Sequence, residues 1–393
     1  MAAVASTTPS QFTFAPTTAE SAAFDRPDEL TSAELAALRA PTVPAGVDST
    51  TFHLAYGARG IPKLIEGLSS STPLFRKQQS LCFLSDLFHR PENVSQGLEE
   101  GIVGILARLL RVDVTVRQKA SECLKIISGH AVGRAGIVQA NVLEILSRRV
   151  SYFFSKQTER FTDSDDLVRR NIHQTLSQLT LDQPGAAAVL STSGLLPALI
   201  GALPFERALD VQVPILSACY NCIRRGAPPH VPDVPIECGA MNVFTKMLKV
   251  GCSSDVLVGV AKCIMALSEY HQGKRLAVEN NTIEVLIPLL RHRRSEVRAA
   301  VAAALMSITI DVEAKRLVVR SGDALPILMS LLRDRSDTLL VNVVKTLTNC
   351  AEDYRGRFQL HQCLKQLQTL YDSPNPQLAQ AARRAVEVIT WRP

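Results

Sequence analysis

The chain has 393 residues, of which 46% are hydrophobic and 5% aromatic, and its 43 basic and 37 acidic residues give a formal net charge of +6. This mild basic excess does not indicate a nucleic-acid partner, which usually leaves a denser basic footprint. Nine scattered cysteines in so long a chain indicate a reducing compartment and argue against a disulfide framework.

Residues 1–50 are rich in Ala, Thr, Ser and Pro and show no sustained periodicity, which predicts a disordered tail. The N-terminus lacks the basic and apolar regions of a secretory signal, and the absence of Arg before Arg26 argues against a mitochondrial presequence. Within the tail, residues 27–39 could form a short amphipathic helix. That helix would either be inert or act as a docking peptide for a partner.

From residue 83 onward a five-residue phrase recurs, with the pattern small or apolar, apolar, variable, polar, apolar. The second residues of its eight copies are Leu84, Leu124, Leu176, Cys219, Leu267, Leu305, Leu347 and Val386. A period of about 42 residues is typical of armadillo/HEAT-type helical solenoids, in which each repeat buries its apolar face only by stacking on its neighbours.

Each repeat has the same predicted plan of two helices. A Gly or small polar residue opens the first helix, which carries an apolar stripe, at 60–68, 101–110, 194–203 and 322–332. Pro62, Pro197 and Pro326 lie near these starts, where a missing N–H does little harm. A longer second helix such as 296–310 carries the phrase. We therefore expect an all-α, right-handed armadillo superhelix of about eight repeats over residues 51–393, with the last repeat as a cap.

Two intervals between phrases are longer than the others, which predicts inserted loops near 151–166 and 226–236. The second segment contains four prolines, which disfavour a helix interior. Inserted loops are either tolerated surface decoration or contact sites. Tyr152, Phe153 and Phe154 in the first segment are therefore candidates for binding a partner.

Three arginines recur near the start of the longer helices, each directly after a valine: Arg117, Arg169 and Arg298. Because equivalent positions align in a solenoid, these arginines, with Arg170, could form a basic strip for an acidic partner. The alternative is an ordinary solvated charged face.

No motif indicates catalysis. Cys219 and Cys222 form a lone C-x-x-C, and Cys222 and Cys350 fill the apolar last place of the phrase, so we expect core thiols. The histidines do not cluster, and neither a phosphate-binding loop nor a G-x-S-x-G motif is present. We expect no enzyme, no cofactor, no metal site and no small-molecule substrate. We also expect no membrane span, since no uncharged apolar run approaches the roughly 20 residues required.

Three segments carry a closer resemblance within the armadillo-repeat superfamily: 55–64, AYGARGIPKL; 130–137, HAVGRAGI; and 381–393, AARRAVEVITWRP. They resemble the armadillo-repeat radial spoke components of the radial spoke head protein 14 family. The residues of the first two motifs that carry it are Tyr56, Gly57, Arg59, Pro62, Gly133 and Arg134. The nuclear import receptors, which use tryptophan and asparagine ladders, fit poorly because the only tryptophan is Trp391.

This resemblance implies a non-enzymatic structural subunit of the radial spoke in the 9+2 axoneme of cilia and flagella. Its partners would be other radial spoke proteins, with no nucleic acid and no membrane, and its role would be to support motility. Two alternatives stay open: an armadillo protein of the central apparatus, and a cytosolic adaptor that binds acidic peptides. At the motif glycine Gly133 we expect a positive φ at a helix boundary, so Gly133→Val should unfold that turn.

Overall fold

The computed structural model describes residues 59–155, 163–225, 233–249 and 252–392. These residues form helices and turns and no strand, and they belong to a compact unit that spans Leu54–Pro393. The predicted tail at 1–50, its helix at 27–39, and the motif residues Tyr56 and Gly57 lie outside the described residues.

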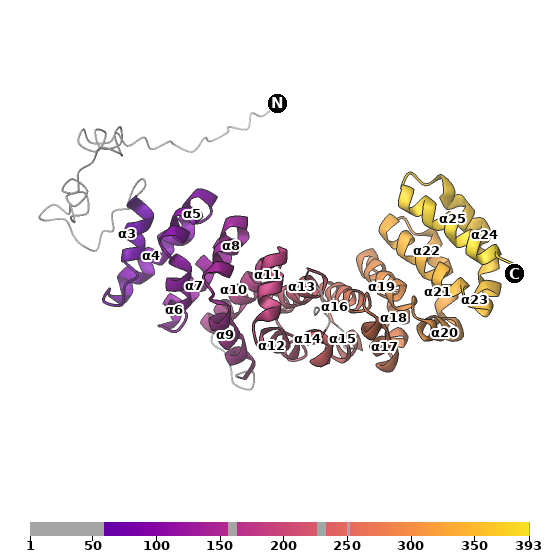
Figure 1. Ribbon diagram of the computed structural model, residues 1–393, viewed down its shortest axis with the longest axis horizontal. Helices are drawn as coiled ribbons and strands as arrows, with labels where there is room; N and C mark the ends of the chain where they lie inside the picture. The colour runs from indigo at the N-terminus through magenta and orange to yellow at the C-terminus, as the bar shows by residue number, and fades with distance from the viewer. Residues whose placement is uncertain (1–58, 156–162, 226–232, 250–251, 393) are drawn as a thin grey trace, which may run out of the picture. The chain divides into compact units, whose positions relative to one another are not determined.

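Each full repeat contains three helices, where the sequence predicted two (Figure 1). The array begins with α3 (Gly60–Glu66) and α4 (Leu74–Leu87). The full repeats that follow are α5 (Pro91–Glu99), α6 (Ile102–Leu109) and α7 (Val114–Gly129); α8 (Ala131–Gln139), α9 (Leu143–Ser155) and α10 (Asp163–Leu179); α11 (Gln183–Ser191), α12 (Leu195–Ala202) and α13 (Leu209–Arg225). The next are α14 (Asp233–Glu237), α15 (Ala240–Lys249) and α16 (Ser254–Leu267); α17 (His271–Glu279), α18 (Thr282–Leu289) and α19 (Ser295–Ile308). The last are α20 (Val312–Arg320), α21 (Ala324–Ser330), η2 (Leu331–Arg333) and α22 (Asp337–Ala351); α23 (Tyr354–Leu360), η3 (His361–Cys363), α24 (Leu364–Thr369), η4 (Leu370–Asp372) and α25 (Pro376–Thr390).

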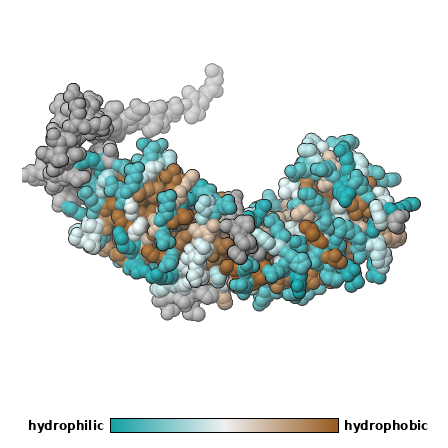
Figure 2. All heavy atoms as spheres, viewed as in Figure 1, coloured by the Kyte–Doolittle hydropathy of each residue, from teal (hydrophilic) through white to brown (hydrophobic). Residues whose placement is uncertain are grey.

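The long third helices carry the recurring phrase and pack against one another in chain order, from α4 through α7, α10, α13, α16, α19 and α22 to α25. The apolar second places of the early phrases form the centre of this packing, since Leu84, Leu124 and Leu176 are fully buried. On the face shown in Figure 2, hydrophobic residues form patches among the hydrophilic residues that cover much of the surface. Stacking thus buries the faces that a single repeat would leave exposed.

The first helices were missed where they bury too little to give an apolar stripe, as α8 does. In α8, only Gly133 and Ile137 are buried. Gly133 is therefore inside a helix, and the expectation that it takes a positive φ at a helix boundary is wrong. A Cβ at Gly133 would lie 1.9 Å from the carbonyl oxygen of Ile127, so the glycine is required by close backbone approach.

The residues with positive φ lie instead in the turn that follows the first helix of a repeat and leads into the second helix. Three of them are glycines, with φ of 71° at Gly101, 72° at Gly194 and 75° at Gly322. The first two stand directly before a second helix, and Gly322 stands two residues before one. Asn141 and Asn281 take the same left-handed conformation at the equivalent turns, with φ of 51° and 55°. Glycine has no Cβ penalty there, and asparagine tolerates this region better than most residues.

The fifth phrase was placed three residues too late. A Cβ at Gly273 would lie 1.9 Å from the carbonyl oxygen of Leu267, as one at Gly133 would from Ile127. Leu267 is therefore equivalent to Ile127, the last apolar residue of its phrase. The corrected fifth phrase runs from Cys263 to Leu267.

The two predicted insertions are partly helical. Residues 151–155 extend α9 and residues 163–166 begin α10, so much of the longer interval is absorbed by longer helices. In the second segment, α14 (Asp233–Glu237) contains Pro235, contrary to the expectation of a loop through residue 236. Residues 156–162 and 226–232 lie outside the described residues.

No single described helix is long and apolar enough to cross a membrane. The pair α11 and α12 reaches that length and hydropathy only when both helices are taken together, and the pair is bent by 88°. This uncharged stretch was overlooked in the sequence. Its apolar side chains are buried within the stack, among them Val189, Leu195 and Leu199.

Candidate protein-interaction surface

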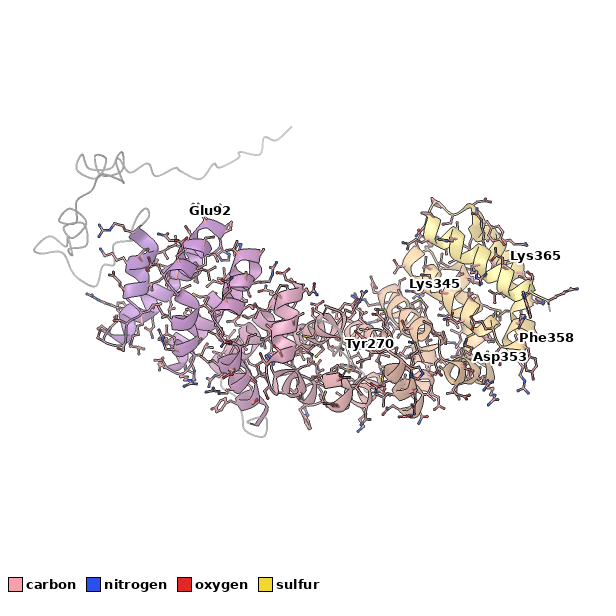
Figure 3. The ribbon with its side chains drawn as sticks, viewed as in Figure 1. Glu92, Tyr270, Lys345, Asp353, Phe358 and Lys365 are labelled. Carbon is pink, nitrogen blue, oxygen red and sulfur yellow. The ribbon has the colours of Figure 1, made fainter. Side chains whose placement is uncertain are left out.

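One row of side chains on the long third helices lies five positions before the last apolar residue of each phrase, and all of its members except the buried Ala303 are exposed or half-buried. From α7 to α25 this row is Glu122, Gln174, Ser217, Lys262, Ala303, Lys345 and Arg384. We call this row and the methionines Met265 and Met306 beside it the third-helix surface. Lys345, on α22, is labelled in Figure 3.

Lys262 and Lys345 are exposed, and neither has an acidic partner among the described residues. The nearby acids are already paired: Glu269 with Arg224 at 3.6 Å, and Glu352 with Lys315. Between the two lysines, α19 contributes the small, buried Ala303 and the half-buried Met306. The surface therefore combines two uncompensated cations with an apolar strip.

Polar side chains next to this surface join neighbouring third helices. The Nδ2 group of Asn349 donates to Thr309 Oγ1 at 3.1 Å, and that of Asn221 donates to Thr180 Oγ1 at 3.2 Å. Ser128 Oγ donates to Gln178 Oε1 in the same arrangement. These bonds hold successive repeats in register, so the amide nitrogens of the two asparagines are occupied within the fold.

Two arginines of the predicted basic strip form ion pairs within the protein. Arg169 is 8% exposed and forms ion pairs with Glu206 and Asp166, both at 2.8 Å. Arg298 forms an ion pair with Asp334 at 2.5 Å and donates to the carbonyl oxygen of His292 at 2.9 Å. Their geometry gives Arg169 and Arg298 an internal role, which corrects the expectation that they are available to a partner.

The other two arginines of the strip differ in exposure. Arg117 is half-buried on α7. Arg170 lies 2.7 Å from Asp210 in an ion pair whose two side chains are 41% and 44% exposed. Only such partly exposed groups could exchange an internal partner for an external one at low free-energy cost.

The aromatic candidates on α9 differ in burial. Phe153 is 3% exposed and belongs to the core, so its assignment to a partner surface is wrong. Tyr152 is 39% exposed and lies under the guanidinium of Arg149, 4.9 Å from the ring centroid. The side chain of Phe154 lies outside the described residues.

The motif residues of the family resemblance that the structure describes have structural positions. Arg59 is exposed at the start of α3, and Pro62 lies in the first turn of that helix. Arg134 Nε lies 2.5 Å from Asp182 Oδ2, which links α8 to the start of the next repeat.

A hollow of about 520 Å³ lies at the C-terminal end of the third-helix surface. Its lining consists of Ala351, Glu352, Arg357, Arg384, Glu387, Val388 and Trp391. The guanidinium of Arg357 lies 5.0 Å from the ring centroid of Trp391, whose side chain is 58% exposed. Two arginines and two glutamates balance the charge of the lining, so this hollow selects neither anions nor cations.

The cysteines of the phrase are core thiols, as expected. Cys222 and Cys350 are fully buried, and burial raises the pKa of each thiol to about 12. Such thiols stay protonated and poorly reactive at neutral pH. Within the described ranges no group of three or more His, Cys, Asp or Glu side chains could hold a metal ion.

Known structures identify the fold. An engineered protein matches with a TM-score of 0.63 and 21% identity, over 84% of this chain and 89% of its own. The designed armadillo repeat protein YIII(Dq)4CqI matches with a TM-score of 0.53 and 22% identity, over 62% of this chain and 99% of its own. This chain has the armadillo-repeat fold. A third match, with a TM-score of 0.52 and 20% identity over 62% of this chain and 99% of its own, is a designed armadillo repeat protein in complex with the peptide (KR)4. No family model matches the chain.

The sequence did not reveal Lys262 and Lys345 in the armadillo array. Each lysine directly precedes a phrase, Lys262 before Cys263 and Lys345 before Thr346. Because the fifth phrase was placed three residues late, Lys262 did not align with Lys345. Correct placement of Leu267 would have shown the shared position.

Proposed function

We propose that the armadillo array is a non-enzymatic scaffold that binds a polypeptide segment along its third-helix surface. The observation that supports this proposal is a pair of exposed lysines, Lys262 and Lys345. Neither has an acidic partner in the described part of the chain, and the neighbouring acids are paired with other cations. These lysines lie two repeats apart. Neighbouring helices pack at 8–10 Å, which places the two ammonium groups roughly 20 Å apart.

The bound segment would carry acidic side chains at both ends and small or apolar side chains between them. An extended chain rises about 3.3 Å per residue, so the two carboxylates would be about six residues apart. Ala303 leaves room for the backbone between them, and Met306 offers an adaptable apolar contact. The affinity would come mainly from the apolar centre, and the lysines would set specificity.

We infer further that the partner assembly is the radial spoke of the 9+2 axoneme, with the protein in the cilium or flagellum. The support is the resemblance of residues 55–64, 130–137 and 381–393 to the radial spoke components, together with a fold suited to scaffolding. A central-apparatus protein and a cytosolic adaptor for acidic peptides are the competing assignments.

Localisation separates these three assignments. A tagged protein should stay with salt-washed axonemes, and tomography of a knockout should show density missing from the radial spokes. Loss of density from the central apparatus would replace the spoke by that structure. A protein absent from cilia would overturn both axonemal assignments and favour the adaptor.

Charge reversal tests the surface itself. Lys262→Glu with Lys345→Glu should abolish co-purification of the neighbouring axonemal proteins while leaving the melting temperature unchanged. The matched control is Arg76→Glu with Lys365→Glu, which changes the net charge equally at exposed residues of α4 and α24. Equal loss of partners in both variants would contradict a role for the third-helix surface.

A further inference from the structure

Four exposed arginines gather at two consecutive turns that lead into third helices. Arg291 and Arg293 precede α19, and Arg333 and Arg335 precede α22. The turns occupy equivalent places in successive repeats. We call these four residues the arginine patch; it is separate from the row of residues that defines the third-helix surface.

The fold holds the two turns against each other through Arg298. Its guanidinium donates from Nη1 to the carbonyl oxygens of His292 and Arg293, at 2.9 and 3.1 Å. Its Nη2 lies 2.5 Å from Asp334 Oδ2, between Arg333 and Arg335 in sequence. One partly buried cation therefore joins the backbone of the first turn to the carboxylate of the second.

Acidic side chains near the patch have other partners, and Asp337 accepts from Asn375 Nδ2 at 3.2 Å. Asp334 is 15% exposed and pairs with Arg298. Arg294 pairs with Asp255 at 3.2 Å and with Glu296 at 3.6 Å. Over the part of the chain that the structure describes, none of the four patch arginines has an acidic partner. Four like charges thus face solvent on two turns that Arg298 joins.

We propose that the arginine patch is a second docking surface, and that it binds a polypeptide segment with consecutive or closely spaced glutamates or aspartates. Guanidinium groups bind carboxylates through two parallel hydrogen bonds, and Arg is the residue best suited to this contact. Turns about 10 Å apart, from the packing distance of neighbouring helices, match carboxylates about three residues apart in an extended chain.

The composition of the two turns favours a protein partner over other polyanions. Residues 291–294 and 333–336 contain no Phe, Tyr or Trp, on which unpaired bases would stack. They also contain no aliphatic side chain that could enter a bilayer interface. What the turns offer is charge with fixed spacing.

The test measures binding of a fluorescent octaglutamate peptide to the full-length protein at low and physiological salt. The variant Arg293→Glu with Arg333→Glu should weaken binding at least tenfold, and the control Arg76→Glu with Lys365→Glu should change it less than threefold. Binding to the unchanged protein should weaken steeply with salt, because exposed charges are screened. An octaglutamine peptide should not bind.

The remaining outcomes are equally decisive. Equal weakening in both variants, or no peptide binding at low salt, would overturn the patch as a docking surface. Binding of single-stranded RNA or of anionic lipid vesicles, lost in the patch variant without peptide binding, would overturn the choice of a protein partner. Octaglutamate binding that survives Lys262→Glu with Lys345→Glu would show that the patch works independently of the third-helix surface.

Discussion

At the scale of single residues, a glycine recurs six positions after the last apolar residue of a phrase. A Cβ there would lie within about 2 Å of the carbonyl oxygen that ends the preceding helix. The pairs are Gly133 with Ile127 (1.9 Å), Gly185 with Leu179 (2.0 Å), Gly273 with Leu267 (1.9 Å) and Gly356 with Cys350 (2.2 Å). In the second repeat Asn93 takes this place, and its side-chain amide donates to the carbonyl oxygen of Leu87 at 2.8 Å.

Substitution of this glycine tests the close approach. Gly133→Ala should lower the free energy of unfolding by about 3 kcal/mol, because backbone atoms cannot move aside cheaply. Gly104→Ala is the control, since nothing lies within 4 Å of a Cβ there. That change should stabilise α6 by up to about 1 kcal/mol. Urea unfolding measures both, and equal effects would contradict the assignment.

One hydroxyl lacks the amide partner that Gln178, Asn221 and Asn349 supply elsewhere in the array. Ser268 Oγ is buried and has no hydrogen-bond partner among the residues that the structure describes, and the place on the next third helix that could supply one is held by Ser307. Asn349 fills that place one repeat later and reaches Thr309 Oγ1. We predict that Ser307→Asn stabilises the protein by about 1 kcal/mol, through a bond to Ser268. A thermal melt of Ser307→Asn with and without Ser268→Ala checks the coupling; an unchanged gain in the Ser268→Ala background would exclude that bond.

Residue-level prediction succeeded where the repeat pattern alone decides burial. Cys222 and Cys350 lie in a phrase position that is apolar in other repeats, and both are core thiols. It failed for Phe153 and Arg169, whose burial depends on the neighbouring repeat. A single sequence gives the phase of a helix but does not show which acid of the next repeat, such as Glu206, an arginine will meet.

At the scale of elements, long arginines connect one third helix to the turn that precedes the next third helix. Arg169 on α10 reaches Glu206, which precedes α13, and Arg298 on α19 reaches Asp334, which precedes α22. Glu206 also accepts from the backbone N–H groups of Arg207 and Ala208, at 2.9 and 2.8 Å. Each acid therefore shapes its own turn and anchors the preceding helix.

The two ion pairs between α10 and the following turn and helix should differ sharply in their contribution. Glu206→Ala removes the partner of a buried guanidinium and should destabilise the protein by about 3 kcal/mol. Asp210→Ala breaks the half-exposed pair with Arg170 and should change stability by less than about 1 kcal/mol. Denaturant unfolding of the two variants gives the comparison, and similar losses would contradict the internal role of Arg169.

The sequence predicted the elements with strong apolar periodicity, namely the second and third helices. The short first helices were missed because their contacts come mainly from glycine and a few small residues, as in α8 and α11. The predicted insertions were misjudged because a longer interval can lengthen helices as well as loops, and α9 and α10 show the former. Of the candidate surface, the sequence supplied charged residues but not which of them remain exposed.

At the scale of the whole molecule, one buried histidine makes stability depend on pH. Burial lowers the pKa of His173 from 6.5 to about 3, and the nearby Arg169 charge acts in the same direction. The unfolded chain then binds a proton at this site between pH 6.5 and about 3, whereas the folded chain does not. The contribution of His173 is fully present above pH 6.5 and is lost as the pH falls.

We expect the free energy of unfolding to fall by about 1.4 kcal/mol per pH unit through this group well below pH 6.5. His173→Gln removes the titrating group, so its stability should depend less steeply on pH between 6 and 4. Urea unfolding of both proteins across that range measures the difference in slope. Parallel slopes would show that His173 takes up a proton in the folded protein.

Every bond described between repeats joins a repeat to its immediate neighbour. The number of repeats in such a chain can therefore change in evolution. Loss of one module brings together two surfaces that already resemble those they replace, so the array can shorten or lengthen without a new architecture. The junctions are not all interchangeable, however. A cut that removed the repeat holding Glu206 but kept Arg169 would strand a buried cation, so module boundaries that keep each arginine with its acid are the ones that recombination can use.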